Sequence, residues 1–425
     1  MMANATDTHR AIDAVWRIES PRLIAGLMRI VRDIGRAEDL AQDALVAALE
    51  QWPQSGVPEN PGAWLMAAAK HRAIDHFRRD ARVERKHEEL GRELAAKEMT
   101  VPDLNSSLDD DIGDDLLRLI FISCHPVLPT EAQVALTLRL LGGLTTDEIA
   151  RAFLAPESTI AQRIVRAKRT LADKQVPFEV PRGPELSQRL SSVLGVIYLI
   201  FNEGYSATAG DDWTRPALCE DALRLGRILA ELAPREPEVH GLVALMEIQA
   251  SRLRARVGAA GEPILLLDQN RARWDHLLIR RGLAALDLAE QLGAIRGPYT
   301  LQAAIAACHA RARAAEETDW TRIVVLYGDL LQIQPSPVVK LNRAVAVAMA
   351  SGPAAGLSLV DDLVAEPSLR HYHLLPSVRG DLLQKLGRHG EARAEFERAA
   401  SLTQNARERQ LLLAKSEIPS PRSEV

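Results

Sequence analysis

Apolar residues recur at spacings of three and four along most of this 425-residue chain, and this spacing restricts the fold more than any other feature. The segment from Arg36 to Trp52 is an example, because its apolar positions fall on one side of a helix: Ala37, Leu40, Ala41, Ala44, Leu45, Ala48 and Leu49. Aromatic residues make up only 4%, whereas β-sandwiches usually need more aromatic and β-branched residues. The sequence therefore predicts an all-α protein, and its length suits two to four domains.

Prolines and glycines divide the first part of this pattern into separate helices. We expect a first helix to end at Gly35, and the segment 53–62, which contains three prolines and two glycines, to be a loop. A further helix is expected from Ala63 to Arg82. A second helical unit follows from Asp114 to Ala172.

Charge is distributed unevenly around a net value of −5. Two stretches are basic, from Lys70 to Lys86 and from Ser158 to Leu171. Between them, from His87 to Asp115, ten acidic residues are opposed only by Arg92 and Lys97. Solvated helix faces are the plain alternative for both basic stretches, but two basic stripes can also follow a nucleic-acid backbone.

The segment from Leu144 to Leu171 has the pattern of a helix-turn-helix. Thr145 or Thr146 is expected to cap a short helix, and Ser158 to cap a second helix with a basic polar face. Gln and Arg side chains on such a helix can bind base edges in the major groove, while Ser and Thr at its start can hold a phosphate. A generic amphipathic helix remains the alternative.

Signals for catalysis, metals and membranes are weak. The three cysteines (Cys124, Cys219 and Cys308) are far apart, and we find no CxxC pair, GxxxxGK[ST] loop or GxSxG elbow. We therefore expect no enzymatic activity, no cofactor and no metal. No apolar run is long enough to span a membrane and no secretory signal is recognisable, so a cytoplasmic location is expected.

The C-terminal part contains a weak internal repeat. Leu341-Asn342-Arg343-Ala344-Val345-Ala346 recurs after 36 residues as Ser377-Val378-Arg379-Gly380-Asp381-Leu382. The later copy continues as LLQKLGRHGEARAEFERA, which has the pattern of a tetratricopeptide helix pair. Such pairs bury their apolar faces by stacking, so a helical-repeat domain is predicted.

Three motifs, in order along about 170 residues, resemble the bacterial sigma factors of the extracytoplasmic-function class. DIGRAEDLAQDALVAALEQW (Asp33–Trp52) is similar to region 2.2, PGAWLMAAAKHRAIDHFRR (Pro61–Arg79) to regions 2.3 and 2.4, and LTTDEIARAFLAPESTIAQRIVRAKRTL (Leu144–Leu171) to region 4.2. The resemblance implies a protein that binds core RNA polymerase and recognises a two-part promoter.

The resemblance also assigns roles to individual residues. Docking on the β′ clamp coiled coil of the polymerase falls to Glu38, Asp39, Gln42 and Asp43, which lie on a helix face that we expect to be exposed. Recognition and melting of the −10 element falls to Asn60, Trp64, Lys70, His71, Arg72, His76 and Arg79. Recognition of the −35 element falls to Ser158, Thr159, Gln162, Arg163, Arg166, Lys168 and Arg169, in a domain that in this family meets the β flap. For Trp64 a place in the core is the alternative, and the family often has Asn in the place of His71.

The last 250 or so residues resemble the C-terminal extension of a large subgroup of these factors. IFNEGYSA (Ile200–Ala207) and LLLDQNRARWDH (Leu265–His276) are similar to its recurrent motifs. Their polar residues fit either structural roles or a ligand site: Asn202, Glu203, Asp268, Asn270 and Arg271. A protein or peptide partner of the repeats is also expected.

The predicted organisation therefore has four parts. They are a region-2 domain (10–87), an acidic linker (88–112), a region-4 domain (113–173) and a helical extension (184–416) that regulates the other domains in cis. Two other functions stay open: a helix-turn-helix regulator with a tetratricopeptide sensor, which does not replace sigma, and a scaffold whose basic helices are merely solvated. An acidic polymerase-docking helix favours the sigma-factor function over these two, because a simple regulator does not need such a helix.

Overall fold

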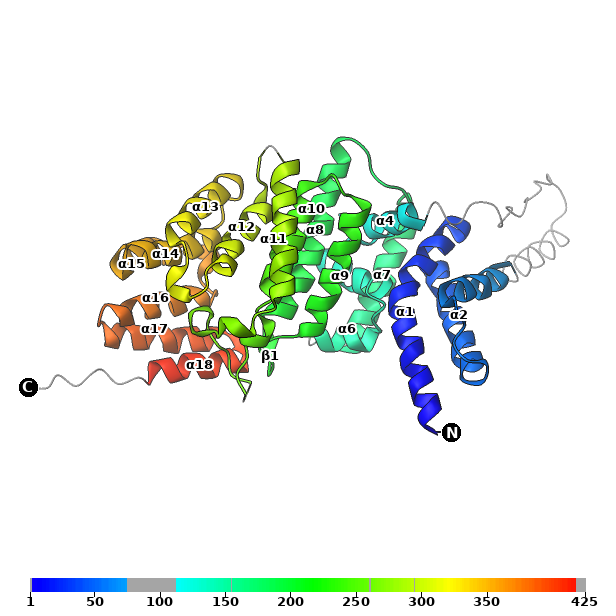
Figure 1. The fold of residues 1–425 in the computed structure, drawn as a ribbon, viewed down its shortest axis with the longest axis horizontal. Helices are drawn as coiled ribbons and strands as arrows, with labels where there is room; N and C mark the ends of the chain where they lie inside the picture. The colour runs from blue at the N-terminus through cyan, green and yellow to red at the C-terminus, as the bar shows by residue number, and fades with distance from the viewer. Residues whose placement is uncertain (1, 75–111, 154, 260, 294, 418–425) are drawn as a thin grey trace, which may run out of the picture. The chain divides into compact units, whose positions relative to one another are not determined.

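A computed structural model of the protein describes residues 2–74, 112–153, 155–259, 261–293 and 295–417. Almost all regular structure in these residues is helical, which confirms the all-α prediction (Figure 1). The chain divides into two compact units, Met1–Val196 and Ile197–Val425, and each is described by itself. Most of the predicted acidic linker (88–112) lies outside the described residues.

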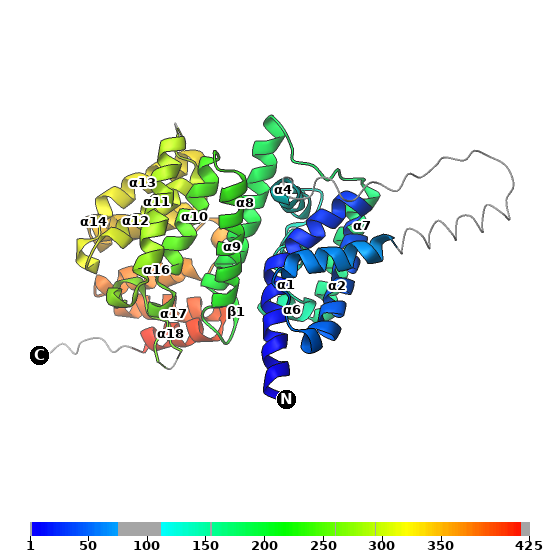
Figure 2. The ribbon, with the colours of Figure 1, turned by 45° about the vertical axis from the view of Figure 1, so that its right-hand side comes forward.

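The first unit is built from short amphipathic helices. Its elements are α1 (Met2–Val31), α2 (Ile34–Ser55), a helix over residues 61–74, α4 (Ile112–Ser123), α5 (Thr130–Leu140), α6 (Thr146–Ala152), α7 (Glu157–Asp173) and the first part of α8 (Pro184–Tyr205). α1 packs along both α2 and α4, as Figure 2 shows from a second side. α5, α6 and α7 pack against one another.

Two predicted helix boundaries in this unit are wrong. The first helix does not end at Gly35: Arg32 takes a positive φ of 51°, and the Asp33 side chain accepts a hydrogen bond from the Arg36 amide at 2.7 Å. Gly35 therefore lies in the first turn of α2, after a cap that the sequence analysis missed. Pro53 does not begin a loop either, because α2 continues to Ser55 and ends at Gly56, whose φ is 84°.

The second unit is a succession of helices, of which α10 and α11 are joined by the long segment 251–275. Its elements after α8 are β1 (Ala209–Gly210), α9 (Pro216–Leu232), α10 (Pro237–Ala250), α11 (His276–Leu292), α12 (Pro298–Arg311), α13 (Trp320–Ile333), α14 (Pro337–Ser351), α15 (Pro353–Asp361), α16 (Leu374–Lys385), α17 (His389–Leu402), β2 (Gln404–Asn405) and α18 (Ala406–Ser416). Short 3₁₀ turns lie at Leu253–Ala255, Leu266–Asp268, Arg271–Arg273, Ala315–Glu317 and Pro367–Leu369. From α12 onward, each helix packs on the next one in sequence (Figure 1).

Asn405 joins the end of this unit to its beginning. Its fully buried amide donates to the carbonyl oxygens of Ala207 at 3.0 Å and Asp212 at 2.8 Å, and its side-chain oxygen caps α18. The two-residue strands β1 and β2 pair in parallel at the same place. The C-terminal helix is therefore fixed to a segment almost two hundred residues earlier in the same compact unit.

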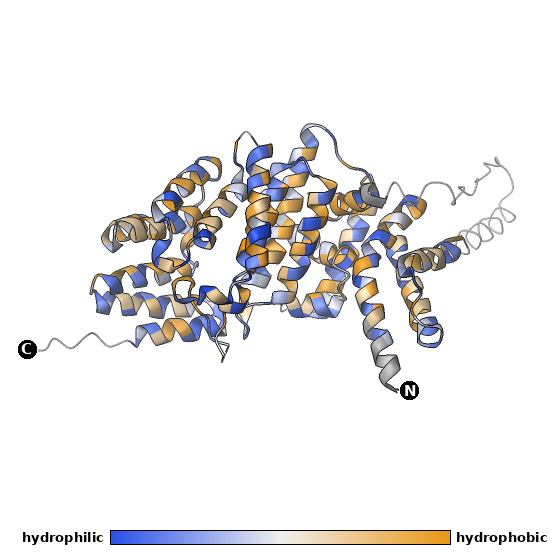
Figure 3. Ribbon diagram, in the orientation of Figure 1, coloured by the Kyte–Doolittle hydropathy of each residue, from blue (hydrophilic) through white to orange (hydrophobic). Residues whose placement is uncertain are grey.

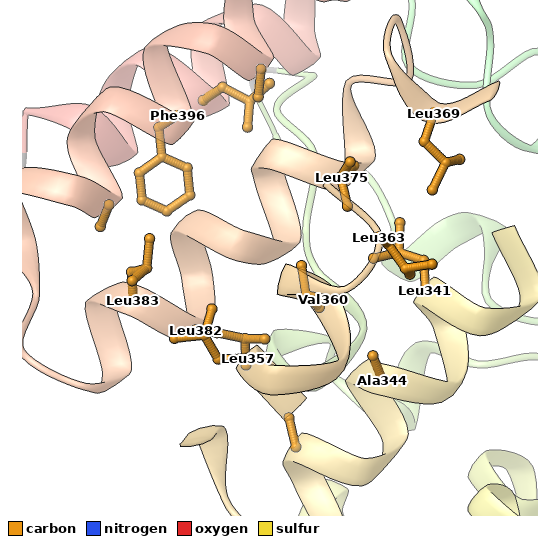
Figure 4. Packing of buried hydrophobic residues seen from close by; sticks show 14 of the residues in the cluster. Leu341, Ala344, Leu357, Val360, Leu363, Leu369, Leu375, Leu382, Leu383 and Phe396 are labelled. Carbon is orange, nitrogen blue, oxygen red and sulfur yellow. The ribbon is translucent and has the colours of Figure 1, made fainter. Parts of the chain in front are cut away.

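Two helix pairs occupy the predicted repeat segment. α14 with α15 and α16 with α17 share one apolar core, in which Leu341 and Val360 from the first pair lie with Leu382 and Phe396 from the second (Figure 4). Stacked pairs of this kind are what the 36-residue recurrence predicts. The assignment of these pairs as tetratricopeptide repeats remains a prediction.

Phe396 gives a direct test of this core. It is 1% exposed, and its ring lies so close to Gly380 that a Cβ added there would meet ring carbons at 2.9 to 3.2 Å. We expect Phe396→Ala to lower the free energy of unfolding of the C-terminal unit by about 3–5 kcal/mol, because the cavity cannot collapse fully. Urea unfolding followed by circular dichroism measures the change. Leu386→Ala, at a residue 37% exposed, is the matched control and should have little effect.

Most helices carry one apolar and one polar face (Figure 3). In the described part of the chain, no helix combines the length and the apolar character that a membrane span requires.

Candidate functional site

The predicted helix-turn-helix is formed by α6 and α7. Thr145 caps α6 by accepting from the Glu148 amide at 3.1 Å, and Glu148 in return accepts from the Thr145 amide at 2.8 Å. This reciprocal pair is a capping box, as the Thr-x-x-Glu spacing allows. α7 starts at Glu157 after Pro156, so Ser158 lies in its first turn and does not cap it, contrary to the prediction.

α7 turns a basic face away from its core. Its buried residues are Ile160, Ile164, Ala167 and Leu171, a spacing of three and four that fixes one face inward. Of the residues predicted to contact the −35 element, Ser158, Gln162, Arg166 and Arg169 are exposed, and Thr159, Arg163 and Lys168 are half-buried. The exposed set spans about three turns, long enough to lie in a major groove.

The helix over residues 61–74 carries the described residues predicted for the −10 element. Asn60 caps it by accepting from the Ala63 amide at 3.0 Å. Trp64 is half-buried and packs edge-on against the buried Trp52, with ring centroids 5.3 Å apart, so it contributes to the core. Partial burial lowers the pKa of Lys70. His76 and Arg79 lie outside the described residues.

The acidic face of α2 is exposed only in part. Asp39 and Asp43 are exposed and Gln42 is half-buried, while Glu38 is only 3% exposed. The prediction that this whole face is exposed is therefore wrong for Glu38. Asp43 also pairs with Arg72, with 3.4 Å between Arg72 Nη1 and Asp43 Oδ1, so two predicted functional surfaces meet here.

Glu38 lies at the contact between α2 and the helix-turn-helix domain. Arg139 Nε donates to Glu38 Oε1 at 2.6 Å, Lys168 forms an ion pair with Oε2, and Gln42 donates to Oε1 at 2.7 Å. Burial alone would raise the pKa of Glu38, but the adjacent Lys168 and Arg139 cations bring it below the ordinary value of 4.5. The carboxylate therefore stays charged at neutral pH and holds two cations of the other domain.

α1 makes further contacts with the same domain. Arg17 pairs with Glu148 at 2.7 Å, and Arg29 approaches the buried Asp115 at 3.4 Å. Burial raises the pKa of Asp115, although Arg29 and Arg118 oppose this effect. No sequence pattern predicts these pairs, because the partners lie 86 to 131 residues apart and no spacing rule connects them.

The start of α8 packs on α4 within the first unit. Arg189, 7% exposed, donates from Nη2 to the Phe121 carbonyl at 3.0 Å, and Ser192 donates to the Cys124 carbonyl at 2.9 Å. These two carbonyls end α4 and have no later turn of helix to bond to. The first residues of the predicted extension therefore supply hydrogen-bond donors to the end of α4 in the preceding domain.

Most polar residues of the two extension motifs have structural partners. Glu203 accepts from Thr208 Oγ1 at 2.9 Å and pairs with Arg215, and Asn270 caps a 3₁₀ turn at the Ala272 amide. Arg271 donates to the carbonyls of His309 at 2.6 Å and Ala312 at 2.7 Å. These contacts favour the structural alternative for Glu203 and Asn270, whereas Arg271 has structural partners and also lies over the Trp274 ring. No group of His, Cys, Asp and Glu suited to a metal ion occurs among the described residues.

Three family models match the chain. Residues 16–83 match Sigma-70 region 2 and residues 118–171 match Sigma-70, region 4. Residues 189–290 match a family of unknown function, DUF6596, which lies wholly in the predicted extension.

Similar proteins fall into two groups. An uncharacterized protein of Rhizobium meliloti (strain 1021) is 44% identical over 399 residues, which is 93% of each chain. A probable ECF RNA polymerase sigma factor, SigI, of Mycobacterium tuberculosis is 26% identical over 175 residues, 40% of this chain and 58% of that protein. The ECF RNA polymerase sigma-E factor of Haemophilus influenzae is 32% identical over 76 residues, 18% of this chain and 40% of that one. No solved structure matches the chain.

Proposed function

Because the chain belongs to the sigma-70 factors of the extracytoplasmic-function class and carries an additional C-terminal domain, we propose that it binds core RNA polymerase and directs transcription initiation at specific promoters. The observation that carries this proposal is the pairing of a region-2 domain with a helix-turn-helix whose basic face is exposed. Bond making belongs to the polymerase, so the protein itself is a recognition factor. A helix-turn-helix regulator that does not replace sigma is the alternative, and the region-2 match argues against it.

Transcription with purified core polymerase and a promoter library tests the proposal. We expect the full chain to start transcription at a defined subset of promoters in the absence of any other sigma factor. A protein that binds duplex DNA but never supports initiation would be the helix-turn-helix regulator instead.

The exposed acids of α2 are the proposed contact with the β′ clamp coiled coil, and the helix-turn-helix domain is proposed to meet the β flap.

We expect the double change Asp39→Lys and Asp43→Lys to weaken binding to core polymerase by about tenfold, equivalent to 1.4 kcal/mol, because it reverses two exposed charges. Fluorescence anisotropy with labelled protein measures the affinity. Glu50→Lys, exposed on the same helix but outside the predicted set, is the control; unchanged affinity of the double variant would remove the docking assignment.

The −35 element is the proposed ligand of α7. We expect Arg163→Ala and Arg166→Ala each to cost about 1–3 kcal/mol of binding and to relax preference at one base pair, as the loss of a bidentate base contact does. Selection from a randomised −35 library measures both effects. Arg182→Ala, exposed beyond α7, serves as control. Variants that keep wild-type selectivity would show that α7 does not recognise bases.

The contact at Glu38 bears on how the two DNA-binding domains act together. Elements centred near −35 and −10 are separated by roughly 25 base pairs, or about 85 Å of B-DNA at 3.4 Å per base pair. Two domains that touch through Glu38, Arg139 and Lys168 do not reach both elements of a straight promoter at once. We therefore take this arrangement as a closed form of the free factor, which opens when polymerase and promoter bind.

The extension is proposed to regulate this factor in cis. Its first helix completes the helix-turn-helix domain through Arg189 and Ser192, which supports a direct physical connection. Stacked helix pairs commonly present a surface to a protein or peptide partner, and such a partner would supply the signal. The polymerase partner implies a cytoplasmic site of action.

A further inference from the structure

Three arginines and three aromatic rings of the extension form a cluster that the proposed function does not use. This arginine–aromatic cluster consists of Tyr205, Trp213, Arg252, Arg256, Arg271 and Trp274. Its residues come from the end of α8, from the segment after it and from the segment between α10 and α11. All of these residues belong to the second compact unit.

The rings connect the three guanidinium groups to one another. Arg256 Cζ lies 3.8 Å from the Tyr205 ring centroid and 5.5 Å from that of Trp213. Arg252 Cζ lies 5.8 Å from the same Tyr205 ring and 5.9 Å from Trp274. Arg271 Cζ lies 4.7 Å from the centroid of the Trp274 ring, which Arg252 also approaches.

The positive charge of the cluster has no carboxylate partner. Throughout the described residues of the extension, no Asp or Glu oxygen lies within 4.0 Å of Arg252, Arg256 or Arg271. The same unit pairs other arginines directly, since Arg215 pairs with Glu203 and Arg227 with the buried Glu247 at 2.8 Å. A buried guanidinium without an anion is costly, so three such groups close together favour the binding of a counter-charge.

Several hydrogen-bond donors of the cluster are also unused. The buried Nε atoms of Arg252 and Arg256 and the buried indole Nε1 atoms of Trp213 and Trp274 have no acceptor. Arg252 is only 8% exposed, whereas Arg256 and Arg271 are half-buried, so the cluster extends from the interior to the solvent. Buried donors without acceptors point to a group that would bring oxygens with it.

His309 adds no charge to this environment. Burial, together with the nearby Arg252 and Arg271, lowers the pKa of His309 to about 4, so its ring is neutral at pH 7. Burial also lowers the pKa of Arg256, and the neighbouring Arg252 acts in the same direction. In both cases burial is the larger cause, and the neighbouring arginines add to it.

We propose that the arginine–aromatic cluster is a binding site for an oxyanion, a carboxylate or phosphate group carried by a small molecule. The anion would neutralise the three guanidinium groups, and its oxygens would accept from the free Arg252 and Arg256 Nε donors. Hydrogen bonds between a charged donor and a charged acceptor are among the strongest in proteins, so a small oxyanion is the ligand that this cluster would bind. Through this site the extension would sense a metabolite.

The test uses the full chain in chloride buffer. Tryptophan fluorescence and the unfolding temperature are followed while phosphate, sulfate, acetate or succinate is added, each against sodium chloride at equal ionic strength. We expect a saturable change with at least one oxyanion at millimolar concentration or below, because Trp213 and Trp274 lie in the cluster. If none of the four probes gives a saturable change, the proposal is wrong.

The variant Arg252→Met tests whether the oxyanion binds at this cluster, and the unfolding temperature shows whether the variant is still folded. We expect it to weaken oxyanion binding at least tenfold, while the unfolding temperature without anion stays the same or rises, because an unpaired buried charge has been removed. Arg281→Met, at an exposed arginine on α11, should leave binding unchanged. Binding that survives Arg252→Met, or that Arg281→Met removes equally, overturns the assignment. Should Arg252→Met not fold, Arg256→Lys at the half-buried position tests the same donors and is expected to weaken binding tenfold.

Discussion

Replacing Glu38 by Lys is expected to open the contact between α2 and the helix-turn-helix domain. The new cation would lie between Arg139 and Lys168 at a site where the native carboxylate is only 3% exposed. Loss of one partner from a buried ion pair typically costs about 3–5 kcal/mol, and reversal of its charge adds repulsion. Energy transfer between dyes at Gln51→Cys and Lys174→Cys, both exposed, measures the separation: we expect transfer to fall sharply.

A charge exchange provides the matched control. Glu38→Lys combined with Lys168→Glu restores one opposite-charge pair across the same contact, and we expect it to recover part of the energy transfer. Glu50→Lys, exposed on α2, changes the net charge equally and should change nothing. Equal transfer in the wild type and in Glu38→Lys would show that Glu38 does not hold the domains together.

Acid should weaken the same contact, because protonation removes the charge of Glu38. The folded pKa of Glu38 lies below 4.5, so the ion pair contributes fully above the ordinary carboxyl range. Its contribution is lost as pH falls through the lowered pKa. Between pH 6 and 8, energy transfer should therefore be constant.

Truncation of the extension is expected to change transcription by about fivefold or more, which corresponds to a coupling free energy near 1 kcal/mol. The informative chain ends after Val196, at the boundary of the two compact units. It retains Arg189 and Ser192, so the carbonyls of Phe121 and Cys124 keep their donors. Transcription from one matched promoter, with the full chain alongside, measures the effect, and either direction supports regulation in cis.

A chain that ends after Asp173 is the structural comparison. It loses both donors, and we expect it to be less stable than the Val196 chain by about 1–3 kcal/mol, because two buried carbonyls are left without partners. Circular dichroism during thermal unfolding checks folding of both chains. If the Val196 chain folds and transcribes at the full-length rate under all conditions, the extension has no regulatory role.

Local patterns predicted local structure well. The capping box at Thr145 and Glu148 and the buried stripe of α7 follow directly from residue spacing. Helix boundaries were less predictable where two signals compete. Asp33 caps α2, so the helix begins before Gly35 although glycine usually ends helices, and Pro53 lies within the last turn of α2. At α7, Pro156 takes the cap position that Ser158 was expected to fill.

Contacts between distant segments could not be predicted in the same way. Arg139 gave no signal in the sequence, although it holds Glu38 from 101 residues away. Glu38 itself fitted the pattern of an exposed acidic face, but it is buried where α7 and Arg139 of α5 meet α2. Arg252 and Arg256 were likewise missed, because an arginine without a carboxylate partner is recognisable only once its neighbours are known.

The helix α8 has a consequence for how this protein could be recombined with others. One uninterrupted helix, Pro184–Tyr205, supplies Arg189 and Ser192 to the first compact unit and Phe201 and Tyr205 to the second. A gene fusion that joins a foreign extension at Pro184 would replace Arg189 and Ser192, which donate hydrogen bonds within the first compact unit. The two halves should therefore be inherited together, and functional chimeras should require a junction inside α8 that keeps the native sequence up to Val196 and the helical phase of the residues that follow it.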